Sequence, residues 1–192
     1  MIEREILHCG DAAAWESWLA ANSESSDGIR LAIAKKGGDH PSVSYSDALD
    51  VALCYGWIDG QKNRLDEHHF LQNFGPRRTR SLWSQINRNR VAALVESGRM
   101  RPPGLAQVEA AKADGRWDAA YAGQRTAEVQ EDFAAAIAAS PAAAAFFATL
   151  NSTNRYALIF RIQIVKRAET RARKIADFVE MLERGETIHP QG

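Results

Sequence analysis

The chain has 192 residues, and its 24 Lys or Arg balance 24 Asp or Glu, so the formal net charge at pH 7 is zero. Apolar residues at 45% and charged residues at 25% are ordinary globular values and exclude wholesale disorder. No run approaches the roughly 18 apolar residues of a membrane-spanning helix, and the acidic N-terminus does not resemble a secretory signal peptide. Two isolated cysteines, Cys9 and Cys54, are typical of a reducing compartment. These features predict a cytoplasmic protein with no membrane span.

The first fifty residues show a helix, a strand and a second helix. Asp11 lies just before two tryptophans and a leucine at helical spacing, which predicts a helix with Asp11 as its N-cap. Apolar residues alternate over 28–35, which predicts a strand. Ser44 begins a capping box, and the helix behind it is expected to end at Gly56.

A hairpin and two further helices follow. Residues 57–58 and 61–65 read as extended and form its first strand, and 69–74 is the return strand, ended by Gly75-Pro76. Helices are then expected over 82–97 and 102–114, each followed by glycine. The first of these two helices is expected to present Trp83, Ile86, Arg90 and Leu94 along one side.

The remainder of the chain is predicted to be helical after a linker at 122–128. The expected helices cover 131–139, 141–150, 156–165 and 170–184. Their expected caps are Ser140, Ser152-Thr153 and Thr170. The stripe of the last helix is Ala172, Ile175, Ala176, Val179 and Leu182. The predicted fold class is α+β, with a small mixed N-terminal module over 1–121, containing helices and a short antiparallel hairpin, and an all-helical C-terminal module over 129–192.

The charge is distributed unevenly along the chain. Residues 60–101 hold nine Lys or Arg against three acids, and residues 155–174 hold seven against one. A neutral chain with two basic segments can attract an anion locally, or the segments can pair with the acidic remainder. Composition alone leaves both alternatives open.

The residues from Tyr55 to Asn87 are the main candidate site. Glycines flank Asp59, and glycine lets the backbone bend tightly or approach a ligand. Two arginines follow a proline, and the guanidinium fork suits a carboxylate or phosphate. The candidate ligand-binding residues are Asp59, Gln61, Arg77, Arg78, Trp83 and Asn87. In the structural alternative Asp59 pairs with one of the arginines and the tryptophan belongs to the core.

A second candidate is a basic patch near the C-terminus. Arg167 and Arg171 are one helical turn apart, so both can face an anion or an acidic partner. The structural alternative is a clasp between helices, with Glu169 and Arg173 forming an i, i+4 pair.

Other chemistry is weakly supported. Cys54 is expected at the C-terminal end of a helix, where the helix dipole disfavours a thiolate. His68 and His69 are adjacent, so on a strand they would point to opposite faces and would not chelate one metal together. We therefore expect no metal and no cofactor. Arginines near Phe74 and Trp83 suit single-stranded nucleic acid in composition, but no nucleic-acid-binding motif is present. Nucleic acid therefore ranks below an anionic small molecule or a protein as the expected partner.

Several motifs in order resemble the YdeI/OmpD-associated family, also labelled bacteriocin-protection proteins. They are Gly56-Trp-Ile-Asp-Gly-Gln61, Phe74-Gly-Pro-Arg-Arg78, Leu82-Trp-Ser-Gln-Ile-Asn87, Gly98-Arg-Met100, Ala111-Lys-Ala-Asp-Gly-Arg-Trp117, Asn154-Arg155 and Lys166-Arg-Ala-Glu-Thr-Arg-Ala-Arg173. The resemblance runs from about Ser44 to Leu182 and implies two modules and a protective role. It supplies no catalytic residues.

The sequence therefore predicts a stress- or protection-related protein that binds an anionic small molecule or an acidic peptide. One alternative is a protein–protein interaction module that uses its basic helical faces. Another is weak nucleic-acid binding. No set of residues indicates a reaction class.

Overall fold

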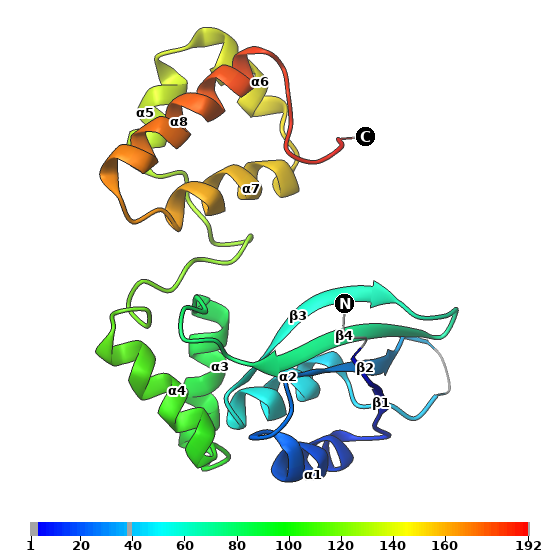
Figure 1. Ribbon diagram of the computed structural model, residues 1–192. Coiled ribbons are helices and arrows are strands. Elements are labelled where there is room, and N and C mark those ends of the chain that lie inside the picture. Colours follow the sequence, from blue (N-terminus) through cyan, green and yellow to red (C-terminus); the bar gives the residue numbers. More distant parts are fainter. Residues whose placement is uncertain (1–3, 38–39, 192) are drawn as a thin grey trace. The chain divides into compact units, whose positions relative to one another are not determined.

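The computed structural model describes residues 4–37 and 40–191. Within these residues the chain forms eight helices and four strands (Figure 1). It divides into two compact units, one made of Met1–Trp83 with Asn87–Ala119 and the other of Ser84–Ile86 with Ala120–Gly192. In the described part no single helix is long and apolar enough to cross a membrane, and only one helix pair, bent by 116°, reaches that length together. The module bounds expected from the sequence stay a prediction.

The N-terminal unit contains a mixed four-stranded sheet. Its strands are β1 (Ile6–His8), β2 (Ile29–Ala34), β3 (Trp57–Arg64) and β4 (His69–Pro76), in the order β1-β2-β4-β3. The predicted hairpin is present as β3 and β4, but the sheet is not purely antiparallel because β1 runs parallel to β2. β4 also continues through Gly75-Pro76. Pro76 pairs with Trp57 of β3, whereas the pairing of β2 with β4 ends at Phe74. Only one neighbouring strand is therefore present at Pro76, a position where proline is tolerated.

The helices of this unit are α1 (Ala12–Asn22), α2 (Tyr45–Cys54), α3 (Gln85–Glu96), whose first two residues belong to the other unit, and α4 (Pro102–Ala113). The predicted caps are confirmed: Asp11 accepts a hydrogen bond from the Ala14 N–H at 2.8 Å, and Ser44 from the Asp47 N–H at 3.1 Å. Gly56 ends α2 with a φ of +74°, a conformation that favours glycine. The prediction for α3 was partly wrong. Trp83 precedes the helix, and Ile86 is 55% exposed.

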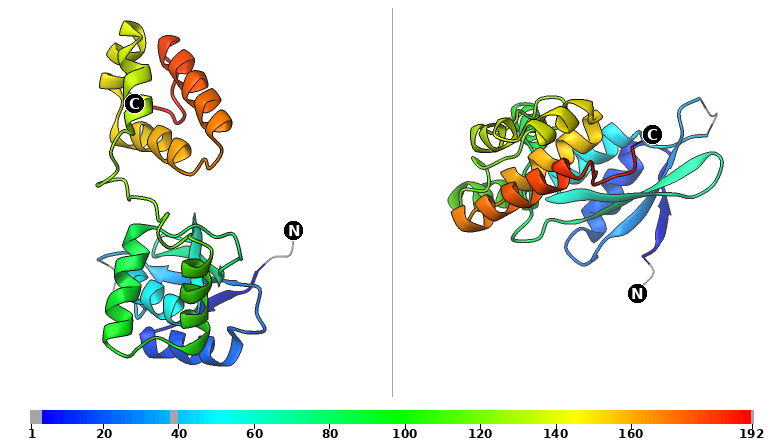
Figure 2. Two further views of the ribbon diagram at one scale, coloured as in Figure 1. Left: turned by 90° about the vertical axis from the view of Figure 1, so that its left-hand side faces the viewer. Right: turned by 90° about the horizontal axis from the view of Figure 1, so that it is seen from above.

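Helices α1 and α2 lie against one face of the sheet (Figure 2). Trp15 of α1 is fully buried, donates its indole N–H to the Ala48 carbonyl at 3.0 Å, and lies 5.5 Å from the Phe74 ring. Residues paired across strands share a sheet face, so Ile29 of β2, which pairs with Phe74, faces the helices too. Because side chains alternate along a strand, Leu31 and Ile33 lie on this same face.

The C-terminal unit is helical, as predicted. Its helices are α5 (Glu131–Ala138), α6 (Pro141–Thr149), α7 (Ser152–Gln163) and α8 (Ala168–Glu183). The most buried core side chains are Phe133, Ala143, Leu158, Ile162 and Leu182. In α8 the predicted stripe was partly wrong, because Ala172 and Ala176 are exposed and Phe178 packs on the core instead.

Two cap predictions in the C-terminal unit were also wrong. Asn151, not Ser152-Thr153, caps α7, and its side chain accepts the Asn154 N–H at 2.9 Å. Thr170 lies inside α8, because that helix begins at Ala168. Ser140 caps α6 as expected.

Candidate ligand-binding site

A cavity of about 700 Å³ opens in the N-terminal unit beside the start of α2. Its volume lies within the range of ligand pockets, roughly 300–1,000 Å³. It is lined by Ile33, Ala34, Lys35, Lys36, Ser44, Tyr45, Asp59, Gly60, Lys62, Phe70 and Gln72. An apolar floor and a polar, mostly cationic rim therefore meet in one place.

A β-bulge in β3 decides which side chains reach the cavity. Asp59 pairs with Phe74 and Lys62 pairs with Gln72, so two residues of β3 oppose one residue of β4. The extra residue shifts the alternation and puts Lys62, rather than Gln61, on the face that carries Asp59. Gln72 is 3% exposed and donates from its side-chain amide to the Gly60 carbonyl at 2.8 Å. This buried bond satisfies a carbonyl at the bulge.

A phenol–carboxylate pair forms one wall of the cavity. The Tyr45 hydroxyl, in the first turn of α2, donates to Asp59 Oδ2 at 2.7 Å. Burial raises the pKa of Tyr45 well above its usual range, and the hydrogen bond to Asp59 raises that pKa further. Tyr45 therefore stays a neutral donor to Asp59 at any physiological pH.

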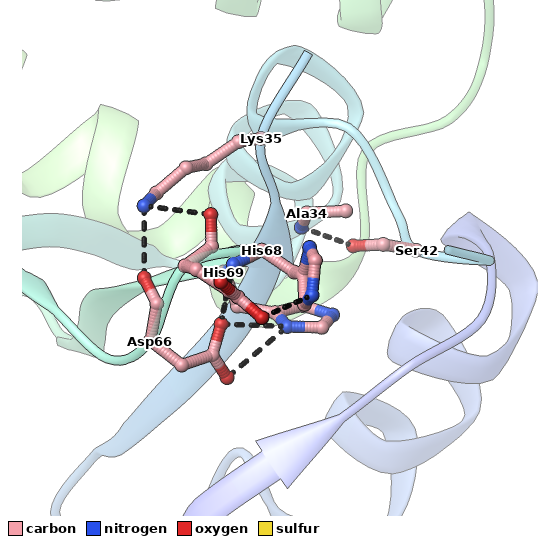
Figure 3. Close-up of polar contacts among 7 residues, drawn as sticks. Ala34, Lys35, Ser42, Asp66, His68 and His69 are labelled. Atoms are coloured by element: carbon pink, nitrogen blue, oxygen red, sulfur yellow. Dashed lines mark hydrogen bonds and ion pairs between the residues drawn. The ribbon is translucent and has the colours of Figure 1, made fainter. Parts of the chain in front are cut away.

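Three lysines make the cavity electropositive. The Lys62 ammonium lies 3.9 Å from the centre of the Phe70 ring, a cation–π contact at the floor. Lys35 donates to the carbonyls of Asp66 and Glu67, at 2.8 and 3.1 Å, and so ties the end of β2 to the hairpin turn (Figure 3). Lys36 is exposed. With the partial positive charge of the α2 N-terminus, these groups outweigh the single carboxylate of Asp59.

The candidate ligand-binding residues predicted from the sequence do not lie together in one site. Asp59 lines the cavity, and it also lines a shallow hollow of about 180 Å³ that contains Arg78. Gln61 is exposed, and its backbone carbonyl accepts from the Asn73 side chain at 2.6 Å. Asn87, in the first turns of α3, lines neither space.

Arg77 and Trp83 belong to the packed interior. Arg77 is 6% exposed and Trp83 is 2% exposed. The guanidinium of Arg77 lies 3.6 Å from the centre of the Trp83 ring and donates to the Leu82 carbonyl at 3.2 Å. Of the two arginines after Pro76, only Arg78 reaches one of these spaces.

Sequence reasoning missed Tyr45, Lys35, Lys36, Lys62 and Gln72. The adjacent lysines after β2 were visible in the sequence, but only the fold brings them beside β3 and α2. Tyr45 was read as part of a capping box. The bulge that selects Lys62 depends on strand pairing, which the sequence does not state.

The two arginines of the predicted basic patch, Arg167 and Arg171, lie in different surroundings. Arg171 forms a two-pronged ion pair with Asp132, its Nε 2.6 Å from Oδ2 and its Nη2 2.8 Å from Oδ1. It also donates to the Ile162 carbonyl at 2.9 Å, so it joins α5, α7 and α8. Arg167 lies exposed at the start of α8. Arg171 is thus a clasp between helices.

The chain matches two protein families. Residues 7–107 match the family described as a domain of unknown function, DUF8412; the match spans more than half of the chain, which therefore belongs to this family. Residues 126–185 match the family described as bacteriocin-protection, YdeI or OmpD-associated, which confirms the resemblance in the C-terminal part. The motifs from Gly56 to Met100 lie in the range of the first family. Comparisons with curated proteins and with solved structures found no match.

Proposed function

We propose that the N-terminal unit binds a small amphipathic anion, a carboxylate or a phosphate with an apolar body, in the cavity beside the start of α2. The observation that carries the proposal is the cavity lining itself. Three lysines and the N-terminus of a ten-residue helix surround a floor of Ile33 and Phe70. Apolar walls with a few placed polar groups are the usual composition of small-molecule sites.

Each part of the lining has a distinct role in this proposal. Phe70 is partly exposed and pairs with the buried Ile33 across β2 and β4, so Phe70 offers most of the apolar surface to the body of the ligand. Lys62, held over the Phe70 ring, is positioned beside that surface to meet the acidic group. Asp59 accepts the hydrogen bond of the Tyr45 hydroxyl through Oδ2, which leaves Oδ1 to accept from a hydroxyl or amide of the ligand.

A binding screen tests the proposal. The full chain is screened by thermal shift against aromatic and aliphatic carboxylates and phosphates. Each compound is paired with a neutral analogue, the amide of a carboxylate or the fully methylated ester of a phosphate. We expect the acids, and not their neutral analogues, to raise the melting temperature by mass action. For the best acid, the Lys36→Ala/Lys62→Ala variant is expected to raise Kd at least about tenfold, or ~1.4 kcal/mol.

Two control variants locate the site. Lys166→Ala removes one exposed lysine from the C-terminal unit and should leave Kd unchanged. Arg78→Ala removes one of the two arginines that line the shallow hollow, the other being Arg4. A loss of binding in this variant would place the ligand in the hollow and overturn the proposed position. The proposal fails outright if no acid stabilises the wild type, or if the double lysine variant binds as tightly as the wild type.

A further inference from the structure

A second hollow, of about 380 Å³, adjoins the cavity beside α2. The two spaces are adjacent because Lys35, Lys62 and Phe70 line both of them. Asn63 and Arg64, the last two residues of β3, complete the lining of the second space, which we call the outer hollow. The Phe70 ring therefore lies between two neighbouring spaces that are both lined by cations.

Strand pairing explains how the cavity continues into the outer hollow. Phe70 of β4 pairs with Ile33 of β2 on one side and with Arg64 of β3 on the other. Directly paired residues share a sheet face, so these three side chains form a row across the sheet. Ile33 lines only the cavity, Arg64 lines only the outer hollow, and Phe70 lines both. Lys62 shares the face of Arg64 and lies two residues away from it, which is about 7 Å along the strand.

Two of the cations are positioned by neutral groups. The Lys35 ammonium donates to the carbonyls of Asp66 and Glu67 at 2.8 and 3.1 Å (Figure 3). These bonds use two of its three N–H donors. The Lys62 ammonium lies 3.9 Å from the centre of the Phe70 ring. Neither contact involves a carboxylate, so both ammonium groups keep their charge for a ligand.

The carboxylates of the nearby hairpin turn are engaged by other groups. Asp66 accepts the backbone N–H groups of His68 and His69 at 2.7 and 2.6 Å. Oε1 of Glu67 lies 2.9 Å from Nε2 of His68. Among the residues that the structure describes, those that line the outer hollow include no acid. The positive charge of the outer hollow is thus left to attract an anion.

From this geometry we infer that the ligand of the cavity is a dianion, with an acidic group at each end of a short apolar body. The inference rests on the proposed function, because it extends the ligand proposed there. The first acid lies in the cavity with Lys36 and Lys62, the apolar body crosses the Phe70 ring, and the second acid reaches the outer hollow. Arg64 and Lys35 bind this second acid. The guanidinium fork suits a carboxylate or a phosphate through two parallel hydrogen bonds.

Isothermal titration of linear dicarboxylates, from glutarate to azelate, into the full chain tests the inference. Each diacid is paired with its monomethyl ester, which has the same chain and a single acid. The best diacid is expected to bind about tenfold more tightly than its monoester. A second series carries a phosphonate in place of one carboxylate, and tighter binding than the monoester in either series supports the inference.

Arg64→Ala separates the outer hollow from the cavity. This variant should raise the Kd of the best dianion about tenfold, to the value of the monoester, and should leave the Kd of the monoester unchanged. Arg167→Ala is the matched control, because it removes an exposed arginine of the C-terminal unit and should change neither value. Circular dichroism of both variants checks that they fold.

The possible failures are distinguishable. If the monoesters bind and no dianion binds more tightly, or if Arg64→Ala keeps the preference for the dianion, the inference is overturned and the proposed function stands. If no acid of any kind binds to the wild type, the proposed function fails and the inference fails with it.

Discussion

The guanidinium of Arg77 lies over the ring of Trp83, 3.6 Å from its centre, with both side chains almost fully buried. Trp83 in turn meets the edge of Trp117, their ring centres 4.9 Å apart. The backbone N–H of Arg77, which follows β4, donates to the carbonyl of Gly56, which precedes β3, at 3.0 Å. Arg77 therefore joins the end of β4 to the start of β3 and also packs on Trp83. Arg77, a candidate ligand-binding residue in the sequence, therefore has a packing role in the structure.

Arg77→Ala is therefore expected to destabilise the protein, whereas Arg78→Ala is not. The first change removes a buried cation–π contact and leaves a cavity against Trp83, which should cost roughly 2–4 kcal/mol. Arg78 is exposed, so its loss should stay within about 0.5 kcal/mol. Urea unfolding of the two variants against wild type measures the difference. Equal stability of both variants would show that the Trp83 contact contributes nothing.

Much of the local structure could be predicted because its causes are local. Asp11 and Ser44 act as caps through bonds to residues three positions ahead, and Gly56 ends its helix through its own backbone freedom. The short strand β1 could not be predicted, since three residues carry too little pattern and its pairing partner β2 lies more than twenty residues away. Ile86 is in helix α3 as predicted but is 55% exposed, because helical spacing identifies a helix face and does not show what covers that face.

The hydrogen bond between Tyr45 and Asp59 predicts a pH-dependent contribution to stability. Tyr45→Phe should cost about 1 kcal/mol at neutral pH by removing this bond. Burial, and then the bond to Asp59, raise the folded-state pKa of Tyr45 above its unfolded value of about 10. The contribution is therefore fully present below about pH 10 and is lost as the pH rises through the folded-state pKa.

Unfolding of the wild type and of Tyr45→Phe across the alkaline range checks this prediction. The gap between their unfolding free energies should be constant below about pH 10 and should narrow above it. Asp59→Asn serves as a control, because it should lower the pKa of Tyr45 in an absorbance titration and leave the part that burial causes. A gap that widens with rising pH would contradict the assigned hydrogen bond.

Gly104 predicts a steric limit between two helices of the N-terminal unit. A Cβ at this position would run into the Cys54 carbonyl oxygen and lie 2.7 Å from the Leu53 carbonyl oxygen. Alanine favours helix by up to about 1 kcal/mol over glycine, but overpacking against rigid backbone should outweigh this, so Gly104→Ala should be destabilising by roughly 2 kcal/mol. Gly10→Ala is the control, since a Cβ there meets nothing within 4 Å. A stabilised Gly104→Ala variant would show that α2 and α4 are not in this close contact.

The candidate site was predictable only in part, and the reason is again distance along the chain. Glycines around Asp59 identified a residue that does line the cavity, yet its hydrogen-bond partner is Tyr45 of α2 and not an arginine of the same motif. Lys62 reaches the cavity because of a bulge, which exists only in the pairing of β3 with β4.

In the C-terminal unit the ion pair between Asp132 and Arg171 predicts the opposite pH dependence. The hydrogen bond from Arg171 lowers the pKa of Asp132, against a smaller opposing effect of desolvation. Because the folded-state pKa lies below the unfolded value of about 3.9, the pair stabilises the fold above that pH and loses its effect as the pH falls through the folded-state value. Asp132 is about half exposed, which limits the contribution to about 1 kcal/mol.

Asp132→Asn and Arg171→Lys test this clasp in the full chain, with unfolding followed at several pH values. Asp132→Asn should lower the unfolding free energy by about 1 kcal/mol at neutral pH, with the gap to wild type closing in acid. Arg171→Lys keeps the charge but loses the two-pronged geometry and the bond to the Ile162 carbonyl, so it should lose most of the same stability. Arg167→Lys is the matched control, because Arg167 is exposed and should tolerate the change. If Arg171→Lys matched the wild type at every pH, charge alone would hold α5 to α8 and the guanidinium geometry would be irrelevant.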